Sequence, residues 1–199
     1  MDDDQYRVLP GPDTDSIRLL GRESYEPVRV AREGHDAPVD DLRPGYLVDA
    51  DINWSGDAPT VAEFEVVRPT LYTYLPNIEP VFEVARDLWE EAQANGEGMG
   101  SCVTRNTDNE VNGAVYVFAN SGPTSRFEEF RDGSRPLEPL VDRINDRDDD
   151  GPAPREVFVS QPAATDAFVV VTIALEKGGL FADTIRDTYD SPMPTEPLG

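Results

Sequence analysis

The first third of the chain alternates short apolar segments with turn residues. The clearest case is residues 46–54, where Tyr46, Val48, Ala50, Ile52 and Trp54 alternate with polar side chains and so share one face of a strand. This pattern favours the core for the shared face, Tyr46 and Trp54 included. Similar segments precede and follow it without any helical period between them, which predicts a small antiparallel β-barrel over residues 1–75.

Residues 42–50 combine a Pro-Gly turn with the beginning of that long strand. In this respect they resemble the corresponding stretch of OB-fold-like barrels. The likeness is at the level of fold, and it covers about a third of the chain. Barrels of this kind often bind oligonucleotides on exposed aromatic side chains. The resemblance therefore implies an OB-like first domain with RNA as a possible partner.

A helical period begins at residue 78. Apolar side chains three and four positions apart predict a helix over residues 78–95, with these residues on its buried face: Ile78, Val81, Phe82, Ala85, Leu88, Trp89 and Ala92. Later segments predict strands at residues 101–105, 114–118, 156–160 and 167–175, and helices at residues 125–130, 138–144 and 180–188.

The order of these elements predicts an α+β domain (αββ-αββ-α) over residues 76–190, with a four-stranded, mainly antiparallel sheet packed by helices. The segment at residues 167–175 is apolar on both faces, so we expect it at the centre of the sheet. Residues 191–199 are rich in Pro, and we expect a loose tail there.

The composition indicates the salt conditions in which the protein works. The chain has 40 acidic and 17 basic residues, a net charge of −23, and Lys177 is its only Lys. Carboxylates hold water and hydrated cations, whereas Lys stems expose apolar area, so this balance favours a halophilic protein. The alternative is an acidic protein from ordinary salt, such as a nucleic-acid mimic. In molar salt the negative charge weighs less against a nucleic-acid partner.

The sequence also bears on location. No apolar run approaches the length of a membrane span, and residues 1–5 (MDDDQ) do not read as a signal peptide. Cys102 is the only Cys, so it forms no disulfide within the chain. We therefore expect a cytoplasmic protein with no membrane partner.

The densest polar chemistry lies in the connector between the strands at residues 101–105 and 114–118. Its candidate ligand-binding residues are Arg105, Thr107, Asp108, Asn109, Glu110 and Asn112. Their spacing resembles the first half of a calcium loop, but Ala119 occupies the twelfth position, where such a loop needs Glu. Asn112-Gly113 also fits a tight turn. The connector is therefore either a structural turn or a binding site.

A second cluster, Arg186, Asp187, Thr188 and Tyr189, has a similar order of residue types. If both clusters meet at one edge of the sheet, their two Arg side chains would hold a phosphate or another polar metabolite. The alternative is a structural network of Arg and Asp. The sequence predicts no catalytic residue, metal or cofactor, because His35 has no neighbouring nucleophile and no nucleotide or zinc motif is present.

Several segments together resemble a haloarchaeal family catalogued as a domain of unknown function. They are residues 6–11 (YRVLPG), 42–46 (LRPGY), 98–99 (GM), 104–110 (TRNTDNE), 130–133 (FRDG), 135–141 (RPLEPLV) and 186–190 (RDTYD). The likeness covers nearly the full chain. It implies a halophilic, cytoplasmic protein and no particular activity.

Two hypotheses about function follow. The first is a non-enzymatic binding or adaptor module associated with RNA, ribosomes or another protein. The second is a small-molecule enzyme or sensor that uses the clusters at residues 105–112 and 186–190. A third possibility, a subunit of a larger assembly, predicts apolar side chains exposed on a chain otherwise covered in carboxylates.

Overall fold

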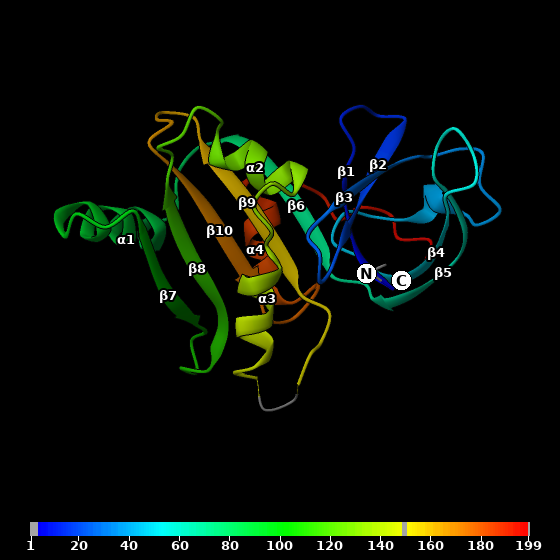
Figure 1. The fold of residues 1–199 in the computed structure, drawn as a ribbon. Coiled ribbons are helices and arrows are strands. Elements are labelled where there is room, and N and C mark those ends of the chain that lie inside the picture. The colour runs from blue at the N-terminus through cyan, green and yellow to red at the C-terminus, as the bar shows by residue number, and fades with distance from the viewer. Residues whose placement is uncertain (1–3, 149–150, 199) are drawn as a thin grey trace.

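Two five-stranded sheets form the fold (Figure 1). The structure is a computed structural model, and it describes residues 4–148 and 151–198. The first sheet is antiparallel and has the order β3-β2-β1-β4-β5. Its strands are β1 (Gln5–Pro10), β2 (Ser16–Gly21), β3 (Pro27–Ala31), β4 (Leu47–Asn53) and β5 (Thr60–Arg68).

The first sheet is open, so the predicted closed, OB-like barrel is wrong. Its two edge strands, β3 and β5, do not pair with each other. The loop between β3 and β4, with the short 3-10 helix η1 (Val39–Asp41), fills the space between them and buries Val39 and Leu42. His35 of this loop bridges the gap, because its ring contacts Ala31 O at 2.7 Å and accepts a hydrogen bond from the Val61 N–H.

The alternation at β4 is confirmed only within the strand. Tyr46, just before β4, and Val48 are fully buried in the core of the first sheet. Trp54 was expected on the same buried face, but 59% of its surface is exposed. The reason is that β4 ends at Asn53, so Trp54 belongs to the turn that leads to β5. Side chains alternate between the two faces only within a strand, so the pattern does not predict the position of a residue beyond its end.

The second sheet has the order β6-β9-β10-β8-β7. Its strands are β6 (Leu71–Ile78), β7 (Met99–Arg105), β8 (Val111–Ala119), β9 (Glu156–Pro162) and β10 (Phe168–Ala174). The predicted four-stranded sheet is therefore wrong by one strand, β6, which pairs in parallel with β9. The predicted position of residues 167–175 is confirmed: β10 is the central strand, and every residue in it is buried.

Helices cover both faces of the second sheet. On one face α1 (Glu83–Ala94) packs against Val115 and Val117, and α4 (Leu180–Thr188) packs against Phe158. On the other face lie α2 (Arg126–Asp132) and α3 (Glu138–Asn145), which bury the apolar side chains Phe127, Phe130, Val141 and Ile144. None of the described helices is both long and apolar enough to cross a membrane.

The first sheet covers one edge of the second. The backbone N–H of Tyr72 in β6 donates a hydrogen bond of 2.8 Å to the carbonyl of Pro44. Gly45 makes this approach possible, because it has φ +99° and a Cβ atom there would lie 2.4 Å from Tyr72 N. The change of sheet falls between β5 and β6, and the division of the chain into domains at residue 75 stays a prediction.

The Pro-rich tail is tied to both sheets. The Arg43 guanidinium donates to the carbonyl of Thr195, and the Tyr46 hydroxyl donates to the Glu196 carboxylate. Lys177, in the loop between β10 and α4, donates to the same carboxylate at 2.6 Å. These contacts hold the described part of the tail against the junction between the sheets.

Candidate functional site

The connector between β7 and β8 is a hairpin loop whose polar groups bond mainly to one another. The Asn106 side chain accepts hydrogen bonds from the backbone N–H groups of Asp108 and Glu110, and it donates one to the Glu110 carboxylate. Arg105 donates to the carbonyl of Asn109 at 2.8 Å. Thr107 is exposed at the tip of this loop.

The positive φ of this hairpin occurs earlier than the Asn112-Gly113 turn that the sequence suggests. Asn109 has φ +65°, whereas Asn112 and Gly113 lie within β8. The Asn112 side chain accepts a hydrogen bond from the Thr104 hydroxyl across the strand pair. Gly113 is needed for close packing, because a Cβ atom there would lie 2.5 Å from the carbonyl oxygen of Ile173.

The second predicted cluster lies in and after α4. Arg186 is buried and forms an ion pair with Glu156 at the beginning of β9. Burial lowers the pKa of Arg186, and the charge of Glu196 opposes this shift. The Tyr189 hydroxyl donates to the carbonyl of Pro80, and burial raises the pKa of Tyr189. Thr188 bonds back into the helix and Asp187 is exposed.

The structure does not bring the two arginines together. Thr104, Gly113, Ala174 and Glu156 form one row across β7, β8, β10 and β9. Three strand spacings therefore separate the strand that leads to Arg105 from the strand that Arg186 contacts, or about 14 Å. Arg105 also bonds into its own hairpin loop, away from that row. Each cluster thus has its own partners.

Two adjoining cavities lie where β6 and β9 end. One, of about 750 Å³, includes Asn77, Asn120 and Gln161 in its lining, and the other, of about 370 Å³, includes Thr188 and Tyr189. Much of the polar chemistry here is already used: Asn120 accepts from the Arg126 N–H, and Gln161 accepts from the Ser125 hydroxyl. In the second cavity, the hydroxyl groups of Thr188 and Tyr189 likewise donate to backbone carbonyls of the chain.

The strand β7 forms an open edge of the second sheet. It is the last strand in the sheet order, and Figure 1 shows no described strand beyond it. The carbonyl of Gly98 accepts a hydrogen bond from the N–H of Ala119. Because backbone groups alternate in direction along a strand, those of Met99, Ser101 and Val103 point away from β8. Each of these three residues offers one N–H and one C=O group.

The edge has little of the usual protection against pairing, because its last residue, Arg105, is its only charged one. Residues 99–104 contain no charged side chain and no Pro, although 29% of the whole chain is charged. Exposed edges are normally protected by charge, Pro or a covering loop. The edge strand β5 of the first sheet fits that rule with Glu63 and Glu65, whereas Met99 and Val103 of β7 remain 42% and 43% exposed.

A groove between α1 and β7 adds side-chain chemistry to the open backbone. Its volume is about 430 Å³, and its lining consists of Glu83, Val84, Asp87, Leu88, Glu91 and Cys102. The three carboxylates are four residues apart and so share one face of α1. Burial raises the pKa of the Cys102 thiol above its ordinary value. We call β7 and this groove together the β7 edge.

The two sides of the β7 edge differ in character. Cys102 pairs with Val115 and lies on the side covered by α1, where the carboxylates are. Met99 and Val103 pair with Phe118 and Ala114, on the opposite side of the sheet. Sequence reasoning predicted a strand here but missed the edge. The signal that could have revealed it is the uncharged run at residues 98–104 in so charged a chain.

Comparison with protein-family models gives one assignment. The family described as "Family of unknown function (DUF6663)" matches residues 1–194. No curated protein and no solved structure matches the chain. The match agrees with the resemblance to a family of unknown function that the sequence segments indicated. Because the match covers nearly all of the chain, the protein belongs to family DUF6663.

Proposed function

We propose that the protein is a non-enzymatic binding module that takes up an extended segment of a partner protein as a further strand beside β7. The observation that supports this proposal best is the unprotected edge of β7, with the outward backbone groups of Met99, Ser101 and Val103. Strand addition is a common mode of peptide recognition, in which main-chain hydrogen bonds give affinity and alternate side chains give specificity.

The two sides of the β7 edge specify the chemistry of the partner segment. On the side of α1, its side chains would meet the carboxylates of Glu83, Asp87 and Glu91. On the other side they would meet the exposed apolar side chains of Met99 and Val103. Because strand residues alternate between faces, the matching segment has Arg or Lys at every second position and apolar residues between them.

The same carboxylates disfavour a second copy of the chain as the occupant. In a pair of copies joined edge to edge about a two-fold axis, the acidic face of one α1 would meet its own counterpart, and like charges repel. A basic partner segment turns that cost into attraction. Self-association is therefore the alternative that the binding experiment must distinguish from binding of a partner.

Fluorescence anisotropy with labelled short peptides tests this proposal. A peptide of alternating Arg and Val should bind, one of alternating Glu and Val should not, and N-methylation of the first peptide's backbone should abolish binding. Ser101→Pro removes one outward N–H and should weaken binding by about fivefold, because a lost hydrogen bond costs roughly 1 kcal/mol. Asp87→Asn should weaken it by a few-fold, and more at about 0.1 M KCl than at about 1 M KCl.

Asp183→Asn is the matched control, since Asp183 is an exposed acidic residue on α4 that does not line the groove. Thermal melts show whether each variant keeps its fold. Equal binding of both peptides, or binding unchanged by Ser101→Pro, would contradict the proposal. A concentration-dependent dimer that also resists the Arg-Val peptide would assign the edge to a second copy instead.

The environment and origin of the protein also remain proposals. We infer a halophilic, haloarchaeal and cytoplasmic protein, supported by 40 acidic residues against 17 basic ones and by the single Lys. RNA or ribosome association stays a prediction from the sequence. The alternative of a small-molecule enzyme or sensor has weaker support, because Arg105 and Arg186 have separate partners.

A further inference from the structure

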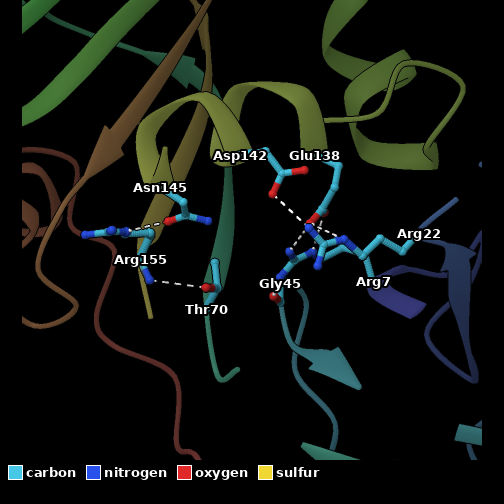
Figure 2. A network of polar contacts seen from close by, with 8 residues as sticks. All are labelled: Arg7, Arg22, Gly45, Thr70, Glu138, Asp142, Asn145 and Arg155. Atoms are coloured by element: carbon cyan, nitrogen blue, oxygen red, sulfur yellow. Dashed lines mark hydrogen bonds and ion pairs between the residues drawn. The ribbon is translucent and has the colours of Figure 1, made fainter. Parts of the chain in front are cut away.

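Three arginines converge at the junction between the two sheets. Arg7 pairs with Leu47, and Leu47 pairs with Arg68, so Arg7 and Arg68 lie on the same face of the first sheet. Two strand spacings separate them, or about 10 Å between backbones, which two Arg side chains can span. Arg22 follows β2, and Figure 2 shows it beside Arg7, facing α3.

Two carboxylates of α3 serve only two of these arginines. Arg7 donates to Glu138 from Nε at 2.8 Å and from Nη2 at 2.5 Å, and it donates to the carbonyl of Gly45 at 2.7 Å (Figure 2). Arg22 donates to Asp142 at 2.9 Å, and its Nε lies 3.8 Å from Glu138. Both carboxylates are therefore already engaged.

Arg68 is the third arginine, and it is half-buried at the end of β5. Within residues 4–148 and 151–198 its guanidinium has no hydrogen bond and no ion pair. Desolvation lowers its pKa, and the charges of Arg7 and Arg22 lower it further. The junction thus holds three positive and two negative groups, an excess of positive charge in a chain whose net charge is −23.

A second polar group at this junction also lacks a partner. The Tyr72 hydroxyl is buried, and it makes no hydrogen bond within the described chain. The Arg7 guanidinium lies 5.4 Å from the centre of the Tyr72 ring, so the phenol belongs to the same cluster. Buried hydroxyl groups are nearly always hydrogen-bonded, so a buried hydroxyl group without a partner needs an explanation.

We propose that Arg68 and Arg22 form a binding site for a phosphate-type oxyanion at the junction between the sheets. A guanidinium presents a planar fork of donors that matches phosphate oxygens. A phosphate-type group offers more acceptor oxygens than a carboxylate, so it can accept hydrogen bonds from the guanidinium groups of Arg22 and Arg68 at once. The anion would balance the excess positive charge and relieve the repulsion among the three arginines.

Titration of inorganic phosphate into the full-length protein, followed by ³¹P line width at constant ionic strength in KCl, tests this site. Saturable binding of one phosphate is expected. Arg68→Gln should weaken it by about tenfold or more, the effect of losing a charge-assisted hydrogen-bonded pair. Arg86→Gln, an exposed arginine on α1, is the matched control and should leave binding unchanged.

Arg68→Gln should not unfold the protein, because it removes repulsion and breaks no bond that the structure shows. Its melting temperature checks this. A single-stranded RNA oligonucleotide is then added as a competitor. If it displaces phosphate, the natural ligand is a nucleic-acid backbone, and if it does not, the natural ligand is a free phosphate group. Failure to saturate, or equal binding by wild type and Arg68→Gln, overturns the proposal whatever happens at the β7 edge.

Discussion

Replacing Glu138 by Gln removes the negative charge that balances Arg7 between the two sheets. The exposed fractions of these side chains are 2% for Arg7 and 4% for Glu138, so water cannot hydrate the charge of Arg7 in place of the carboxylate. The variant keeps the volume of the side chain, but an amide can accept from only one of the two donating nitrogens of Arg7. Arg7 would then be a buried cation with its charge uncompensated.

The expected loss of stability follows from this burial. Breaking one side of a buried ion pair costs about 3–5 kcal/mol, because the remaining charge stays desolvated. For a chain of this size, each kcal/mol corresponds to roughly 2–4 °C in melting temperature. Urea unfolding in about 1 M KCl, where surface repulsion is screened, measures the change directly.

Two further variants isolate the cause. Glu128→Gln disturbs an exposed pair with Arg131 at 3.5 Å on α2, and it should cost less than about 1 kcal/mol. The double variant Arg7→Met with Glu138→Leu should recover most of the loss, because apolar replacements of both partners need no compensation. A loss below about 1 kcal/mol for Glu138→Gln would refute the view that this pair joins the two sheets.

Three other predictions concern the junction and the groove. Gly45→Ala should destabilise the protein by at least about 2 kcal/mol in urea unfolding, because φ +99° and a contact of 2.4 Å with the β6 backbone both exclude a Cβ atom; a neutral result would contradict the close approach. Glu196→Gln should cost about 1–2 kcal/mol and expose the tail to limited proteolysis, since it weakens the contacts with Tyr46 and Lys177; an unchanged cleavage rate would show that the tail does not depend on them. Because burial raises the pKa of Cys102, its rate of alkylation by iodoacetamide at pH 8 should be lower than that of free cysteine. The rate should still increase with pH where the rate for free cysteine has become constant. Equal rates would refute the shift in pKa.

The parts of the fold that sequence reasoning predicted are those set by local pattern. The apolar run of β10, interrupted only by Thr172, predicts burial on both faces, and the alternation of β4 places Val48 in the core. The hairpin at residues 99–119 follows from two apolar segments around a polar loop. In each case neighbouring residues carry the whole signal.

Apart from Trp54, whose prediction failed because β4 ends at Asn53, the parts that failed depend on pairing between distant segments. Nothing near β6 tells that it pairs with β9, and the unclosed first sheet depends on how a long loop fills the space between β3 and β5. Arg7 and Glu138 are 131 positions apart, so their ion pair has no local signature. The same holds for the candidate site, because an edge strand is defined by the absence of a neighbour and not by its own residues.

Amide hydrogen exchange at β7 tests the central claim most directly. The outward N–H groups of Met99, Ser101 and Val103 should exchange quickly in the free protein, because no described strand covers them. Addition of the Arg-Val peptide should slow exchange at these three amides and leave the inward amides of Gly100 and Cys102 unchanged. Protection of these outward amides before any peptide is added, or exchange that the peptide does not alter, would contradict partner binding at the β7 edge.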